Sequence, residues 1–208
     1  MKPQEIEDKS FQIIDAEAGK HGFDEREWPV VRRMIHTSAD FDYIKSVRFY
    51  RGGVHPIDVG IQAILQGKNI ITDTNMARVG IRQKEVTEFG GKVSCLIADG
   101  AVAQKAKDSG TTRALAAVDM AIEEMEGGIY VLGNAPTALL RLITLIREKK
   151  ANPALVIGFP VGFVNAAESK EELMGVEIPY ITNKGRKGGS NIAASIVNAL
   201  AIMAYQQK

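Results

Sequence analysis

The sequence predicts an α/β protein with a doubly wound, mainly parallel five-stranded sheet and helices on both faces of that sheet. Five short β-rich segments recur along the chain, and most are continuously apolar, which is typical of strands covered on both sides. Amphipathic helical patterns lie between these segments, and such alternation favours a doubly wound sheet. A helical N-terminal region precedes the first segment.

The N-terminal region contains two predicted helices, at residues 5–19 and 24–38. The first is amphipathic and ends at Gly19. In the second, Asp24 and Glu27 have the spacing of a capping box, in which each side chain accepts a hydrogen bond from the other residue's backbone N–H. Its expected apolar face contains Trp28, Val31 and Ile35.

The remaining elements follow in order along the chain. The expected strands are residues 69–73, 92–99, 128–133, 154–160 and 177–182, and the expected helices are residues 111–126, 136–150 and 190–205. Pro136 occupies a first-turn position, where proline is well tolerated, and cations close the same helix. Ser190 is expected to cap the last helix.

The composition limits the classes of function. A chain of 208 residues with a net charge of +1 suits one domain, residues 1–208, without a global field that would attract nucleic acid or a membrane. The single cysteine, Cys95, excludes an internal disulfide and is expected to be buried in a strand. No signal peptide or membrane span is apparent, so we expect a cytoplasmic protein.

The loops at the carboxyl ends of the strands are the expected ligand site, because open α/β sheets bind ligands there. Several place a glycine and a small polar residue just before a helix, where free backbone N–H groups attract anions. In the last loop, Lys184, Arg186 and Lys187 lie beside Gly188 and Gly189. A solvated basic turn is the alternative, and the loop lacks nucleotide-binding spacing, so a carboxylate suits it as well as a phosphate.

The three histidines, His21, His36 and His55, are scattered and show no metal-ligand spacing, so no metal site is expected. His36 lies at the end of a predicted helix. On composition alone, a capping or core histidine is more common there than a catalytic one, and the protonation state stays open.

Six segments of the chain form a recognisable set. In chain order they read "SFQIIDAEAG", "VRRMIH", "ITDTNMARVGI", "GNAPTALLRL", "VIGFPVGFVNAAESKEEL" and "GRKGGSNIAASIVNAL". Together they resemble the precorrin-8X methylmutase family. The resemblance extends from near residue 5 to near residue 201. It implies an isomerase of cobalamin biosynthesis that moves a methyl group from C11 to C12 of ring C of a tetrapyrrole. It also implies a flavodoxin-like sheet, a homodimer with a site near the interface, and no cofactor.

The family motif assigns roles to particular residues. His36 is expected to act as proton donor and acceptor, and Ser10 and Arg33 are expected to contact the substrate. From the residues alone, Ser10 could equally be an exposed helix residue and Arg33 a surface cation. The substrate is a flat macrocycle edged with acetate and propionate arms. Its expected carboxylate ligands are Arg113, Asn134, Lys170, Arg186, Lys187 and Ser190. Gly158 and Gly162 are expected to clear space for the ring, and Phe163 and Val164 are expected to face it.

Other functions compete with the methylmutase. A non-catalytic corrinoid carrier would use the same loops without needing His36. A flavin-binding or phospho-receiver module is a further possibility, although the third strand ends in Gly133-Asn134 rather than in a phosphorylatable Asp. Within the methylmutase hypothesis, the cobalt-containing substrate is favoured over the metal-free one on overall likeness.

Overall fold

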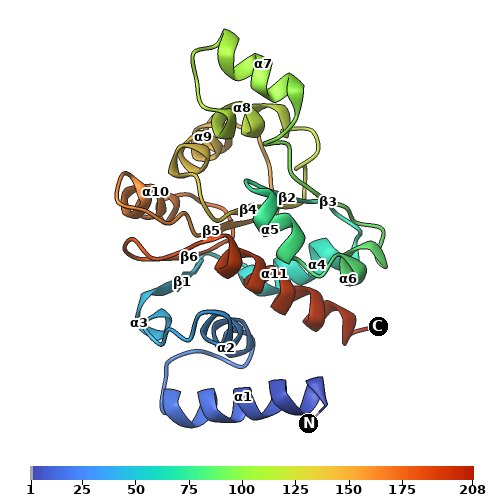
Figure 1. Ribbon diagram of the computed structural model, residues 1–208, viewed down its shortest axis with the longest axis vertical. Helices are drawn as coiled ribbons and strands as arrows, with labels where there is room; N and C mark the ends of the chain where they lie inside the picture. The colour runs from blue at the N-terminus through green and yellow to red at the C-terminus, as the bar shows by residue number, and fades with distance from the viewer. Residues whose placement is uncertain (1) are drawn as a thin grey trace.

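The computed structural model describes residues 2–208, and its centre is a six-stranded sheet in the order β1-β6-β5-β4-β2-β3 (Figure 1). The strands are β1 (Val47–Phe49), β2 (Ile70–Thr72), β3 (Val93–Ser94), β4 (Ile129–Leu132), β5 (Leu155–Gly158) and β6 (Tyr180–Asn183). β2 to β6 pair in parallel, which confirms the α/β class and the mainly parallel sheet.

The predicted number of five strands is wrong, because β1 adds a sixth strand that pairs antiparallel with β6. β1 has only three residues and lies at the edge of the sheet, so it leaves no long apolar run in the sequence. The strand predicted at 92–99 is also too long. Only Val93 and Ser94 pair with β2, and a turn then begins at Leu96. Cys95 consequently lies after the strand and is half-buried rather than buried.

Helices cover both faces of the sheet. They are α1 (Pro3–Ala18), α2 (Glu27–Ser38), α3 (Tyr43–Ser46), α4 (Pro56–Leu65), α5 (Asn75–Gly80), α6 (Gln83–Thr87), α7 (Gly100–Asp108), α8 (Arg113–Met120), α9 (Pro136–Arg147), α10 (Ala166–Leu173) and α11 (Ser190–Tyr205). Successive residues of a strand point to opposite faces of the sheet, so they belong to two separate hydrophobic cores. Ile129 and Val131 pack with residues of α2, α4 and α11, whereas Tyr130 and Leu132 pack with residues of α8, α9 and α10.

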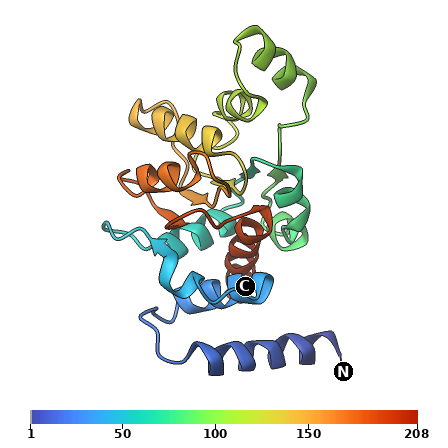
Figure 2. The same cartoon turned by 60° about the vertical axis from the view of Figure 1, so that its left-hand side comes forward.

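Figures 1 and 2 show the layers that result. α1 is the outermost helix on one side and lies against α2, while α7 projects from the other side and packs on α8. None of the helices described within residues 2–208 is long and apolar enough to cross a membrane.

The ends of three helices test the capping arguments. The backbone N–H of Asp24 donates to Glu27 Oε2, and that of Glu27 donates to Asp24 Oδ1, which confirms the reciprocal pair before α2. α8 ends at Met120 and not, as predicted, near Glu126. Three glutamates follow Met120, and negative charges at the C-terminus of a helix are unfavourable to the helix dipole. α11 begins at Ser190 as predicted, but Gly189 occupies the cap position and the serine does not cap the helix.

Candidate active site

His36 lies in the last turn of α2 and faces a hollow between α1 and α2. The hollow has a volume of about 380 Å³ and is lined by Ser10, Ile13, Ile14, Glu17, Ile35, His36, Ala39 and Phe41. The imidazole is exposed, and the ring of Phe11 meets it edge-on with the ring centroids 5.2 Å apart. The structure therefore brings Ser10 and His36 into one cavity, although Ser10 Oγ donates to the Ile6 carbonyl in its own helix.

Arg33 lies near this hollow with its charge already compensated. Its Nη1 is 3.0 Å from Glu7 Oε1, and its guanidinium lies over the ring of Phe11. Arg32 likewise forms an ion pair with Asp15, and its guanidinium also lies over the ring of Phe11, 4.3 Å from the ring centre. Substrate contact by Arg33 stays a prediction, and it requires the arginine to share or leave Glu7.

The loops after β5 and β6 join to form a rim at the carboxyl edge of the sheet. Gly162 N donates to the Arg186 carbonyl, and the Arg186 guanidinium lies 5.5 Å from the centre of the Phe163 ring. Phe163 is 85% exposed and Val164 is 78% exposed, which is unusual for large apolar side chains unless a ligand or partner covers them. The structure thus brings together the predicted residues Gly162, Phe163, Val164 and Arg186.

Lys187 connects this rim to the end of α2. Its Nζ lies 2.6 Å from Asp40 Oδ2 and 2.7 Å from Asp42 Oδ2, in the turn between α2 and α3. Hydrogen bonding to Asp40 and Asp42 raises the pKa of Lys187, and Lys187 lowers the pKa of Asp42. The ammonium group is therefore already paired with two carboxylates of its own chain.

Lys170 is fully buried, and its burial does not favour the predicted substrate contact. Its Nζ donates to the Lys187 carbonyl at 2.6 Å and to Asn183 Oδ1 at 3.2 Å. Glu168 lies two residues before Lys170 on the same helix, but the buried ammonium group does not pair with it. Asn183 Nδ2 donates to the same carbonyl, so Lys170 and Asn183 together hold the last loop in place from inside.

This burial predicts an unusual dependence of stability on pH. Burial lowers the pKa of Lys170 from 10.5 to about 8. Between these values the unfolded chain binds the proton and the folded chain does not, so the free energy of unfolding rises with pH. The slope approaches about 1.4 kcal/mol per pH unit between these two pKa values. It falls to zero well below pH 8 and again above pH 10.5, where the gain in stability is complete. We expect Lys170→Met to lose this slope in urea unfolding at pH 7.5, 8.5 and 9.5, and parallel curves for the two proteins would contradict it.

The entry to α9 is not a free anion site, contrary to expectation. Asp73, at the end of β2, accepts hydrogen bonds from the backbone N–H groups of Gly133, Asn134 and Ala135 at 2.8–3.0 Å. Burial raises the pKa of Asp73, and these three donors oppose that shift. A carboxylate of the chain itself thus occupies the place predicted for a substrate carboxylate. The Asn134 side chain is exposed and stays a candidate contact.

Ser190 and Gly158 also serve the packing of the chain. Ser190 is buried, and its Oγ lies 2.7 Å from Thr74 Oγ1. A Cβ on Gly158 would come within 2.6 Å of Leu173, so this glycine makes room for α10 and not for a ligand. Gly162 differs, because its φ of +149° favours glycine, while a Cβ there would meet only Ala166, at an ordinary contact distance of 3.9 Å.

Comparison with known proteins identifies the family. The family model described as "Precorrin-8X methylmutase" matches residues 5–203. Cobalt-precorrin-8 methylmutase of Priestia megaterium is 48% identical over 98% of this chain and 89% of its own, and that of Salmonella typhimurium is 42% identical over 96% and 94%. A solved precorrin-8X methylmutase from Thermus thermophilus superimposes with a TM-score of 0.91 at 45% identity, covering 98% of this chain and 97% of that one.

The chain belongs to the precorrin-8X methylmutase family. It is therefore an isomerase of cobalamin biosynthesis, as the six motifs predict, and the corrinoid-carrier alternative finds no support.

In the methylmutase fold, Arg113 lies away from the other residues that are predicted to contact the substrate. It begins α8, on the opposite side of the sheet from α2, and it is exposed. Within residues 2–208 no ion pair engages it, so its guanidinium is available for a carboxylate.

Sequence reasoning missed Asp40, Asp42, Asp73 and Asn183. Of these, only Asp73 carried a signal, as an acid at a strand end immediately before the cap residue Thr74.

Asp24, Glu27 and His55 place three ligand atoms within 4.8 Å of one another, but they suit a metal poorly. His55 Nδ1 accepts from the Ile57 N–H as the cap of α4, so in the neutral ring Nε2 carries the hydrogen and cannot ligate. Arg51 Nη1 also lies 2.6 Å from Glu27 Oε1.

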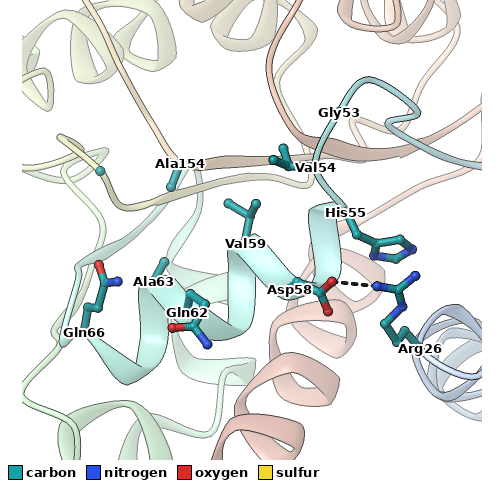
Figure 3. A pocket seen from close by; sticks show the side chains of 11 residues that line it. Arg26, Gly53, Val54, His55, Asp58, Val59, Gln62, Ala63, Gln66 and Ala154 are labelled. Carbon is teal, nitrogen blue, oxygen red and sulfur yellow. Dashed lines mark hydrogen bonds and ion pairs between the residues drawn. The ribbon is translucent and has the colours of Figure 1, made fainter.

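A larger cavity, of about 690 Å³, lies beside α4 at the other edge of the sheet (Figure 3). Gly127 and Ala154, which line it, precede β4 and β5, so the cavity faces the amino ends of these strands. Figure 3 shows Val54 and Val59 in its middle and the paired Arg26 and Asp58 at one end. This lining offers no free cation for acidic arms, whereas four of the six motifs lie at the carboxyl ends of β2, β4, β5 and β6.

Proposed function

We propose that this enzyme moves a methyl group from C11 to C12 of ring C of cobalt-precorrin-8, with His36 as the proton donor and acceptor. The observation that carries the proposal is the exposed imidazole in a hollow shared with Ser10 and linked through Asp40 to the carboxyl-edge rim. General acid–base catalysis requires such access to the reacting group.

The chemistry needs no net change in composition. The imidazolium gives a proton to the macrocycle, which makes ring C electron-poor. The methyl group then leaves C11 with its bonding electron pair and bonds to C12. The imidazole takes a proton back, so substrate and product are isomers and no cofactor is consumed. Ile13 and Ile14 of α1 and Ile35 of α2 make part of the lining of the hollow apolar, which suits a flat ring.

The rim supplies contacts to the edge of the macrocycle. Phe163 and Val164 offer exposed apolar surface for the ring, and Arg186 offers a guanidinium to an acidic arm. Arg113 and the Asn134 side chain are further candidates. Lys170 and Ser190 shape the rim from inside, since both are buried against their own chain.

The names of the relatives support the cobalt-containing substrate. Among the curated relatives, those from Priestia megaterium and Leptospira interrogans, at 48% and 44% identity, are cobalt-precorrin-8 methylmutases. Proteins named precorrin-8X methylmutase are 37% identical (Pseudomonas aeruginosa) and 45% identical (the solved structure from Thermus thermophilus), so the support comes from the 48% relative and from the number of cobalt-precorrin-8 names. The test is anaerobic incubation with each form of precorrin-8. We expect the visible spectrum to change without a change in mass, and faster with the cobalt form. An unchanged spectrum with both forms, or a change in mass, would overturn the proposal.

We also infer that the sheet is flavodoxin-like. Counted along the chain from β2, the parallel strands lie in the order 2-1-3-4-5, which is the flavodoxin order. We infer one domain over residues 1–208 and a cytoplasmic enzyme that meets neither membrane nor nucleic acid.

We further expect a homodimer, because Met76 and Val79 of α5, like Phe163 and Val164, expose apolar surface near the carboxyl edge. Light scattering should report twice the chain mass of 22.6 kDa. Val79→Asp should lower that value toward a single chain. A wild-type protein that elutes as one chain at micromolar concentration would refute the dimer.

A further inference from the structure

Lys187 is placed between two parts of the proposed active site. Its backbone carbonyl accepts from the buried Lys170 at 2.6 Å and from Asn183 at 2.9 Å, so the position of the residue is determined from inside the sheet edge. Its side chain reaches in the other direction, to Asp40 and Asp42 at 2.6 and 2.7 Å. One residue thereby joins the rim loop to the turn that follows α2.

That turn forms part of the hollow of His36. Asp40 lies between Ala39 and Phe41, and both of these residues line the hollow. Ala39 ends α2 in the left-handed conformation, with φ of +53°, and its N–H donates to the Ile35 carbonyl. A non-glycine residue in this conformation is held there by its surroundings. Asp42 N also donates to Asp40 Oδ1, which keeps the two carboxylates on one side of the turn.

The two carboxylates would repel each other without a cation between them. An exposed ion pair contributes little to global stability, but here one ammonium compensates two like charges in a short turn. The free energy of this contact therefore acts locally, on the orientation of the turn and of the α2 terminus.

We propose that Lys187 is a positioning residue, whose ammonium holds the Asp40–Asp42 turn, and with it His36, against the rim that carries Arg186. The inference rests on the proposed function in one respect, namely that His36 is the proton donor. It replaces the direct contact between Lys187 and a substrate carboxylate that the motif suggests.

The test compares three variants with a matched control. Lys187→Met removes the charge, Asp40→Asn combined with Asp42→Asn removes its partners, and Lys187→Arg restores the cation. Lys45→Met is the control, because Lys45 is an exposed lysine on α3 near Asp42 that forms no ion pair within the described residues 2–208.

We expect Lys187→Met and the double asparagine variant each to lower kcat at least fivefold with KM within twofold of wild type. Combining all three substitutions should lower kcat no further, since both changes break the same contact. Lys187→Arg should recover kcat to within twofold, and the control should match wild type. A tenfold rise in KM with unchanged kcat in Lys187→Met would indicate direct substrate contact and overturn the proposal, as would a wild-type kcat in the double variant.

A second measurement needs no substrate and separates this inference from the function itself. Ring signals of His36 in ¹H–¹³C NMR spectra of the free protein should shift in Lys187→Met and in the double variant, but not in Lys45→Met. Unchanged His36 signals would overturn the proposal even if turnover fell. If the enzyme does not rearrange cobalt-precorrin-8 but these signals shift, the proposed function fails and the positioning role stands.

Discussion

Replacing His36 with alanine is expected to lower kcat for the methyl shift at least about 100-fold, because positioned acid–base groups contribute 10²- to 10⁴-fold. The dissociation constant of the tetrapyrrole should stay within about threefold of wild type. The imidazole is one exposed group in a hollow that seven other residues line, so most of the binding surface survives the substitution. Stopped-flow absorbance gives turnover, and titration of the visible spectrum gives binding.

Two further variants make the result specific. His36→Gln keeps hydrogen-bonding atoms but cannot exchange a proton near neutral pH, so it should be as inactive as His36→Ala. Thr37→Ala, at the next position of α2, which is also exposed, should leave kcat within twofold of wild type. An alanine variant of His36 that retained more than a tenth of wild-type kcat would remove this residue from the chemistry.

The largest expected effect on stability comes from Asp73→Ala. Three backbone N–H groups of residues 133–135 would lose their acceptor, and the N–H of Gly133 is buried. A buried donor left without a partner costs about 1–3 kcal/mol, and the two part-buried donors of Asn134 and Ala135 add a smaller loss, so we expect the free energy of unfolding to fall by about 2 kcal/mol or more. Urea unfolding monitored by circular dichroism measures this loss.

Asp73→Asn is the matched control, because it keeps the shape of the side chain. One oxygen can still accept from Asn134 and Ala135, but the amide nitrogen then faces the Gly133 N–H, so an intermediate loss is expected. If alanine at position 73 left the free energy of unfolding within about 1 kcal/mol of wild type, the carboxylate would not be what holds the loop.

Local sequence patterns predicted the elements that bury regular faces. In β4, four consecutive apolar residues indicate a strand that is buried on both faces. In α11, the spacing of Ile192, Ile196 and Leu200 indicates the buried face of the helix. Both patterns can be recognised without knowing which elements pack against them. The Asp24–Glu27 pair is likewise local, since its two hydrogen bonds span three residues. β1 escaped prediction because its three residues become a strand only by pairing with β6.

The candidate site likewise has features that the sequence could predict and features that it could not. The order of the six motifs identified the family, and the motif around His36 predicts an acid–base role for this residue. The partners of the charged side chains could not be predicted, because Lys170, Lys187 and Arg33 meet groups 13 to 147 residues away in sequence. A cation in a glycine-rich loop has the same sequence pattern whether it faces a ligand or its own chain.

The sequence alone thus determined the α/β class, the mainly parallel sheet and the family, because each depends on neighbouring residues or on motif order. The same motif order predicts the acid–base role of His36. Only the tertiary structure decided which charges are free. Asp73 fills the entry to α9, and Asp40 and Asp42 engage Lys187, whereas Arg186 stays exposed at the rim. The physical reason is that a charged side chain pairs with whatever opposite charge or dipole the fold brings within about 3 Å, and that distance is a property of the packed chain.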